Sequence, residues 1–355
     1  MARRSERDLS VHVPQALPQR LSARAAEVLR EVVDAYLKTG EPVASQQVSE
    51  NTSMGMSSAT ARVLMGELTE NGYLDQPHTS AGRMPTSLGL RIYLDSLMRT
   101  RAPSARLRDG IDSALREAGP TPGDIVRAGA RHLAETCHLT ALSRTPRLET
   151  RRLLGLRLLR LAPDRVMALL VFDDETVHHH VLNSGSPDSV LERVMHLFHH
   201  ELAGLTLAAS RARLRTEVDG LDQESRTLAD SALTDVDSPE EAVLVEGRNN
   251  LVERASDPLS LSEILRSLED KRLLLYVLDE MVAVDGPQVL LGAEAGVFGL
   301  TRCTVVAAPY FIGRQRAGAL ALVGPVRVEY ARLVPLVNYT AGAISGMLRG
   351  ASDAA

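Results

Sequence analysis

Apolar residues recur with the spacing of an amphipathic helix in three successive segments near the N-terminus. The first segment runs from Leu21 to Thr39, between the possible N-cap Ser22 and the helix-ending Gly40. Proline forces an extended turn at Glu41-Pro42, and a short second helix is predicted over residues 44–50. Three helices of this kind can pack as a small core.

The third segment begins after Ser57 and ends at Asn71-Gly72. Its apolar stripe has i, i+3, i+4, i+7 spacing and consists of Ala61, Leu64, Met65 and Leu68. Residues 75–85 are rich in Pro, Gly, Ser and His, which is typical of a ribbon, and Thr86 is placed to cap a further helix through Met98. This order of elements predicts a winged helix-turn-helix.

In a helix-turn-helix the third helix lies in the major groove of DNA. The side chains opposite its buried stripe would then meet the duplex: Ser58, Arg62, Val63 and Gly66. Hydroxyl groups in its first turn suit phosphate oxygens, and a basic side chain on the ribbon can reach a backbone or a minor groove. We therefore predict DNA contacts from eight residues: Ser57, Ser58, Thr60, Arg62, Val63, His78, Thr79 and Arg83.

Charge gives this prediction little support. Residues 1–105 hold 12 Arg and Lys against 11 Asp and Glu, and the rest of the chain holds 28 against 34. The N-terminal part is therefore slightly basic and the remainder acidic, which is the expected sign for a DNA-binding segment. Many winged helices bind protein instead, so an adaptor that never touches DNA stays open as an alternative.

The pattern changes after the linker at residues 101–105. Two helices are predicted first, over 107–118 and 124–137. Three antiparallel strands follow, over 152–161, 166–172 and 177–182, with turn residues between them. A helix over 187–203 closes this part of the chain.

Polar helix patterns dominate residues 210–281, where 242–245 has the pattern of a strand and 259–278 that of a Leu-rich helix. Strands then resume at 288–291, 304–309 and 317–323, and a helix over 330–348 ends the chain. A strand-rich unit interrupted by a helical insert explains this order. We predict an α+β multidomain protein, since 355 residues suit two or three domains.

Histidines could indicate a metal site. His178, His179 and His180 are consecutive on a predicted strand, so at most two of them share a face. His196 and His200 have the i, i+4 spacing of helical metal ligands. No cysteine or carboxylate cluster joins them in the sequence, so we predict structural or solvated roles and no metal.

The sequence also gives no case for catalysis. It contains neither a phosphate-cradling GxxxxGK motif nor a GxSxG elbow. The two cysteines, Cys137 and Cys303, make no disulfide framework and fit a reduced cytoplasmic location. The N-terminal MARRSERDLS lacks the apolar core of a signal peptide, and no apolar run is long enough to span a bilayer. We expect neither enzyme activity nor a cofactor.

Longer runs carry a specific resemblance. LSARAAEVLREVVDAYLKTG, EPVASQQVSE and SSATARVLMGELTENGYLDQPHTSAGRMPTSLGLRIYLDSL resemble the heat-inducible transcription repressor family HrcA, and PHTSAGRMPT is close to a signature. VEGRNNLVE, LLGAEAG and LVGPVRVEYARLVPLVNY extend the resemblance towards the C-terminus in the family's order. It covers most of residues 20–350.

The chain departs from the family pattern at informative positions. The family usually has Pro-Val-Gly-Ser where this chain has Ala44 in place of the glycine, and Ile-Arg-Asn where it has Ala61-Arg62-Val63. The asparagine's amide could pair with an adenine edge, whereas Val63 can contact a thymine methyl. Near the C-terminus Glu294-Ala295 replaces Glu-Asn, while Arg327 and Tyr330 are kept. We expect altered base readout rather than lost binding.

The resemblance implies a homodimer that binds an inverted-repeat operator in double-stranded DNA upstream of chaperone genes. It also implies that a GroE-type chaperonin keeps the repressor active until heat-damaged proteins occupy the chaperonin. The implied architecture is a winged helix-turn-helix, then a GAF-like domain carrying an inserted dimerisation domain. The predicted parts are a disordered arm (1–19), the DNA-binding domain (20–103), the two GAF-like parts (104–209 and 283–350) and the insert between them (210–282). A ligand- or metal-sensing regulator with a different operator is the alternative.

Overall fold

The computed structural model describes the chain in segments. These are residues 21–78, 81–119, 121–145, 152–173, 177–216, 222–234, 243–250, 268–282, 286–292, 294 and 303–353. The predicted arm at residues 1–19 lies outside them. Two compact units divide the chain at Met98, close to the predicted linker, and each is described by itself.

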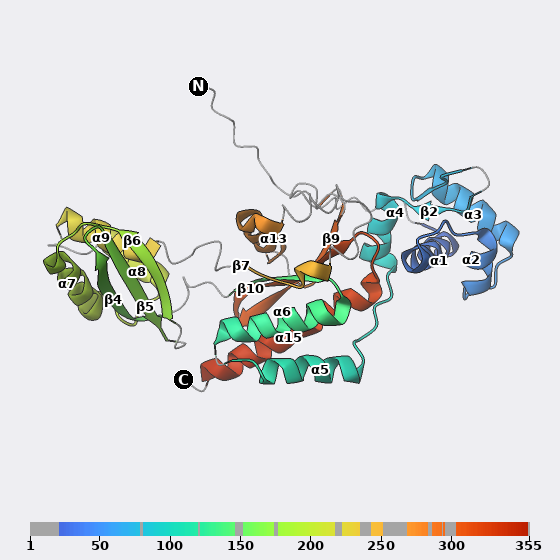
Figure 1. Ribbon diagram of the computed structural model, residues 1–355. Coiled ribbons are helices and arrows are strands. Elements are labelled where there is room, and N and C mark those ends of the chain that lie inside the picture. The colour runs from blue at the N-terminus through green and yellow to red at the C-terminus, as the bar shows by residue number, and fades with distance from the viewer. Residues whose placement is uncertain are drawn as a thin grey trace, which may run out of the picture. The chain divides into compact units, whose positions relative to one another are not determined.

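Unit 1 contains the predicted helices and ribbon in the predicted order (Figure 1). The elements are α1 (Ala23–Thr39), α2 (Ser45–Asn51), α3 (Ser58–Glu70), β1 (Leu74–Asp75), β2 (Met84–Pro85), α4 (Ser87–Ile92) and the π-helical turn η1 (Tyr93–Leu97). Strands β1 and β2 pair antiparallel, with Leu74 opposite Pro85. The predicted last helix is thus α4 continued by η1.

Local sequence signals set these ends. The side chains of Ser22 and Thr86 accept hydrogen bonds from first-turn backbone N–H groups, which caps α1 and α4 as expected. Gly40 ends α1 with a left-handed φ of 77°, where a side chain would be strained. The buried surface of α1 includes two charged side chains, since Glu27 and Arg30 are buried beside the apolar ones.

Unit 2 contains a five-stranded antiparallel sheet with strand order β7-β3-β10-β9-β8. Its strands are β3 (Thr140–Arg144), β7 (Val243–Glu246), β8 (Gln288–Leu291), β9 (Cys303–Ile312) and β10 (Gln315–Pro325). The helices around it are α5 (Ala105–Arg116), α6 (Pro122–Cys137), α13 (Lys271–Val282) and α15 (Tyr330–Asp353). Figure 1 shows α6 and α15 on one face of this sheet and α13 on the other.

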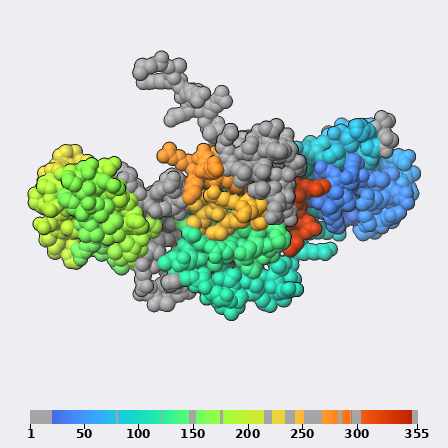
Figure 2. All heavy atoms as spheres, in the orientation of Figure 1, coloured from blue at the N-terminus to red at the C-terminus, as the bar shows by residue number. Residues whose placement is uncertain are grey.

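A second sheet in unit 2 has strand order β4-β5-β6. Its strands are β4 (Leu153–Ala162), β5 (Arg165–Phe172) and β6 (Val177–Asn183), which are antiparallel neighbours as predicted. Its helical elements are α7 (Asp188–Leu197), η3 (Phe198–Leu202), α8 (Leu207–Thr216) and α9 (Gln223–Thr234). These helices and one face of the sheet share a single apolar core, and their atoms form one packed body, green to yellow in Figure 2.

The described elements of the predicted insert, residues 210–282, pack in two different groups. A domain boundary at residue 210 would separate α8 and α9 from the β4-β5-β6 core, although both helices contribute buried side chains to that core. The predicted insert also includes β7 and α13, although β7 pairs with β3 and α13 packs on β9 and β10. The sequence suggested a border at 210 because helices become polar there, but polar helices can still bury one apolar face. The described elements that form the β4-β5-β6 core lie between Leu153 and Thr234.

No helix among the described residues is long and apolar enough to cross a membrane.

Candidate nucleic-acid interface

Helix α3 begins at a hydroxyl-capped end. Ser57 is its N-cap, and Ser57 Oγ accepts a hydrogen bond from the Thr60 backbone N–H at 3.1 Å. The hydroxyl groups of Ser57 and Thr60 also lie 3.0 Å apart. The structure thus brings these two predicted residues together at the end of the helix where backbone N–H groups point outwards.

The predicted division of α3 into two sides is confirmed except at Leu64 of the predicted stripe and Gly66 of the predicted exposed side, which are both half-buried. Ala61, Met65 and Leu68 are buried in the core of unit 1. Arg62 is exposed and Val63 is 62% exposed on the opposite side. An exposed valine next to an exposed arginine gives this side both an apolar and a cationic group.

Ser58 differs from the other hydroxyl residues. Its Oγ lies 3.1 Å from Ser45 Oγ, in the first turn of α2, and its side chain is only half-exposed. Ser58 therefore joins α2 to α3, and this contact orients the two helices.

Arg83 lies against α3 rather than at the tip of the ribbon. Its Nε donates to Thr69 Oγ1 at 3.0 Å, and its backbone pairs with Val43 through two hydrogen bonds. Arg83 therefore ties the ribbon both to α3 and to the segment before α2. His78 is exposed at the bend after β1, and Thr79 lies outside the described residues.

A buried charged group beneath the α2–α3 turn was missed from the sequence. Glu27 of α1 is 5% exposed, and its Oε1 accepts hydrogen bonds from Ser53 Oγ at 2.9 Å and from Arg30 at 2.5 Å. Arg30 also pairs with Glu31 at 2.9 Å. Burial alone would raise the pKa of Glu27, but the hydrogen bonds of Ser53 and Arg30 and the charge of Arg30 outweigh it and lower that pKa. Glu27 thus holds the turn that leads into α3.

A second buried contact joins the end of unit 1 to α1. Tyr93 of η1 is 1% exposed, and its hydroxyl donates to Asp34 Oδ1 at 2.5 Å. Burial, followed by the hydrogen bond to Asp34, raises the pKa of Tyr93. No sequence motif predicts either buried contact. The one indication in the sequence is that Glu27, Arg30 and Asp34 lie between the apolar residues of α1.

The β4-β5-β6 sheet has a side that its helices leave uncovered. Cross-strand neighbours on this side form three rows: Leu159, Met167 and Val181; Arg157, Leu169 and His179; and Gly155, Val171 and Val177. We call these nine residues the outer sheet face. Leu159, Val177 and Val181 are 46%, 54% and 40% exposed, a concentration of apolar surface that marks interaction sites in soluble proteins.

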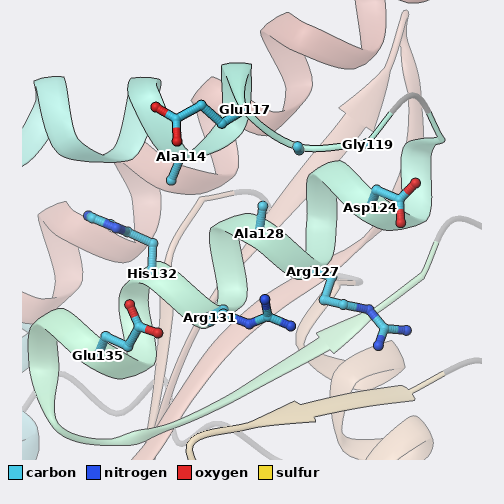
Figure 3. Close-up of a pocket in the computed structure, with 10 residues that line it drawn as sticks. Ala114, Glu117, Gly119, Asp124, Arg127, Ala128, Arg131, His132 and Glu135 are labelled. Atoms are coloured by element: carbon cyan, nitrogen blue, oxygen red, sulfur yellow. The ribbon is translucent and has the colours of Figure 1, made fainter.

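Unit 2 also has a surface hollow of about 370 Å³ between α5 and α6. Figure 3 shows that its labelled side chains come from both helices and the segment between them. Basic Arg127 and Arg131 share it with acidic Glu117, Asp124 and Glu135, so no one charge sign dominates.

The histidines follow the predicted geometry. His178 and His180 lie on the helix-covered side of β6, opposite Leu170 and Ala168, and His179 lies on the other side. The rings of His196 and His200 have centroids 4.2 Å apart. Within the part of the chain that the structure describes, no group of three or more His, Cys, Asp or Glu could hold a metal ion.

Comparison with known proteins gives matches over most of the chain. The family described as "HrcA protein C terminal domain" matches residues 123–334. A protein of Sphingopyxis alaskensis named heat-inducible transcription repressor HrcA is 34% identical, covering 93% of this chain and 98% of its own. A protein of the same name from Sorangium cellulosum is 32% identical, covering 92% and 97%. A crystal structure described as a hypothetical protein matches with a TM-score of 0.60 at 23% identity, covering 94% of this chain and 100% of that one.

Proposed function

Because this chain belongs to the HrcA family of heat-inducible transcription repressors, it is a negative regulator of transcription and not an enzyme; we propose that it acts as a homodimer on an inverted-repeat operator upstream of chaperone genes. The observation that carries this proposal is the exposed side of α3. It presents Arg62 and Val63 beside a hydroxyl-capped helix N-terminus. We place the repressor in the cytoplasm, where its DNA is.

Each predicted DNA-contact residue takes a specific role in this proposal. Ser57 and Thr60 bind phosphate oxygens and set the register of α3 on the duplex. Arg62 and Val63 meet base edges in the major groove. His78, Thr79 and Arg83 contact DNA from the ribbon. Arg83 also positions α3 through its hydrogen bond to Thr69. Ser58 acts mainly by joining α3 to α2.

The homodimer has its physical support in the outer sheet face. A single α3 reads only a few base pairs, whereas two copies related by a twofold axis read both halves of an inverted repeat. A second copy of this chain is the occupant that fits the outer sheet face, because a twofold contact is self-complementary and would cover the exposed side chains of Leu159, Val177 and Val181 of one copy with those of the other. We therefore propose segment 152–234 as the dimerisation domain, inserted in a GAF-like domain built on the five-stranded sheet.

The role that we propose for the chaperonin depends on the stability of the repressor fold. We propose that a GroE-type chaperonin maintains the active fold and that heat-damaged proteins divert it, so that repression fails as folding demand rises. A loss of about 1–2 kcal/mol in folding free energy changes the active fraction several-fold, which makes a marginally stable repressor a sensitive switch. Equal refolding and equal operator binding with and without chaperonin would contradict this part of the proposal.

The test of DNA binding is a salt-titrated mobility shift with the full-length protein. The probe is the inverted repeat upstream of the chaperonin genes in the organism that encodes this chain, with a scrambled repeat as control. Specific binding by the natural chain, lost in Arg62→Ala, is the expected result. Binding to neither duplex in the presence of chaperonin would favour a protein-binding adaptor or a regulator with another operator.

A further inference from the structure

The exposed side of α3 has an unusual composition for a surface that binds DNA. Four residues at i, i+3, i+4 and i+7 share it: Ala59, Arg62, Val63 and Gly66. We call them the reading face. Arg62 is the one member with a polar side chain, and the other three present methyl groups or bare backbone. The exposed acids Glu67 and Glu70 come after them in α3, and their charge disfavours phosphates near that end.

Gly66 is not required by the fold. It lies in the middle of α3, and a Cβ built there would meet nothing within 4 Å. Glycine is less favourable than alanine inside a helix, so this position loses stability with no gain in packing. Gly82 and Gly89 of the same unit differ, since a Cβ there would come within 2.3 Å of Val43 O and 2.1 Å of Tyr73 O. A glycine that packing does not explain, on a face proposed to meet DNA, allows another molecule to approach the helix backbone closely.

Val63 adds an apolar contact at the same place. Its 62% exposure leaves its methyl groups in water unless a partner covers them. In the major groove, the base-pair group that matches a valine methyl is the C5-methyl group of thymine. Arg62, one residue away, has the fork of N–H donors that matches O6 and N7 of guanine.

We propose that the reading face selects a guanine with a neighbouring thymine in each operator half-site. Arg62 binds the guanine, Val63 covers the thymine methyl, and Gly66 leaves room for the base edges to approach α3. This proposal rests on the proposed DNA binding and adds its base specificity. Readout at the thymine is apolar, so it depends on the methyl group and not on a hydrogen bond.

Methyl deletion from the DNA tests Val63 directly. The full-length protein first selects a duplex from a random-sequence library; if no duplex is enriched, the proposed function itself fails and the question of base readout does not arise. Each thymine of the selected duplex is then replaced by deoxyuridine, which removes only the C5-methyl group. We expect a loss of affinity of about fourfold at one thymine per half-site, the value of one buried methyl group.

The same duplexes are then measured with Val63→Ala. We expect this variant to bind the parent duplex more weakly and to show no further loss at that thymine, because its partner methyl is gone. Leu88→Ala, which removes an exposed apolar side chain of α4, should keep the full thymine dependence. Equal sensitivity to deoxyuridine in the natural chain and in Val63→Ala overturns the assignment of the methyl contact.

Gly66→Ala separates DNA approach from folding. We expect the variant to melt at a higher temperature, since alanine is the better helix former, and yet to bind the selected duplex about tenfold or more weakly. Gly342→Ala is the matched control, because Gly342 is an exposed glycine in helix α15 whose Cβ would also meet nothing within 4 Å. The control should keep full affinity. Unchanged affinity in Gly66→Ala would overturn the role of Gly66.

Discussion

The reading face of α3 and the outer sheet face both expose apolar side chains, but the two surfaces differ in everything around those side chains. On α3, one exposed valine has an arginine beside it and a hydroxyl-capped helix N-terminus one turn away. On the sheet, apolar residues from three strands form two rows, and the row between them contains Arg157, Leu169 and His179. A narrow apolar spot bordered by cationic and donor groups suits a nucleic acid, whereas a broad apolar area suits protein. Exposure of a residue thus indicates a partner only together with its neighbours.

The largest effect that can break this comparison is expected from a charge placed in one row of the outer sheet face. We expect Leu159→Lys to convert the protein from dimer to monomer, because the contact would then bury a charged lysine from each copy among apolar side chains. Operator affinity should fall more than about a hundredfold, since one half-site then binds alone. Sedimentation velocity and a mobility shift measure the two effects. A dimer that survives Leu159→Lys would remove the outer sheet face from the proposal.

The fold of each subunit should survive in that variant, because Leu159 is already 46% exposed and contributes little to the core. The matched control is Leu154→Lys. Leu154 is 53% exposed but occupies the bulge of β4, outside the three rows. We expect the control to remain more dimeric than Leu159→Lys at the same concentration.

The next effect concerns what lies beneath α3. We expect Glu27→Gln to lower the free energy of unfolding by about 1–3 kcal/mol, since the buried group loses charge-assisted hydrogen bonds while Arg30 keeps Glu31. The lowered pKa of Glu27 means that its stabilisation is present above the pKa of an unfolded glutamate and is lost as the pH falls through the folded value. Urea titrations between pH 7 and pH 3 should show the difference between the natural chain and the variant shrinking with acidity. A constant difference would assign the effect to packing alone.

A smaller effect is expected at the N-cap of α3. Ser57→Ala removes the acceptor for the Thr60 N–H and should cost about 1 kcal/mol of stability. It should also weaken DNA binding, whereas Ser22→Ala, which removes the matching cap of α1, should cost similar stability and leave affinity nearly unchanged. Equal loss of affinity in both variants would mean that Ser57 acts only through folding.

The smallest effect is expected at Arg83. In Arg83→Lys the bond from Nε to Thr69 is lost but the positive charge stays. We expect affinity for operator and for scrambled DNA to fall together by less than about tenfold, with an unchanged salt dependence. Arg83→Gln should in addition reduce the slope of log affinity against log salt by about one. Selective loss on the operator would indicate instead that Arg83 reads bases.

Features whose residues lie close together in the sequence could be predicted from it, and contacts between distant residues could not. Caps and the apolar stripe of α3 lie within one turn of the residues they organise, so Ser57, Asn71 and the buried face were predictable. The Glu27–Ser53 contact joins residues 26 positions apart, and neither residue belongs to a motif. The contribution of α8 and α9 to the β4-β5-β6 core is another such long-range feature. Whether α8 packs on β4 or on β9 depends on tertiary contacts that the periodicity of α8 does not contain.

Strand pairing in the five-stranded sheet has a consequence for the order of folding. Thr140, at the start of β3, donates its hydroxyl hydrogen bond to Gly247, just beyond β7, across a separation of 107 residues. Closing so long a loop in an unfolded chain costs conformational entropy before the native contacts that offset this cost have formed. A segment 152–234 that folds first shortens the effective loop, so β3 and β7 should pair late. Until they do, the edge of β3 stays open to other chains, and it is during this interval that a folding cage would protect the polypeptide.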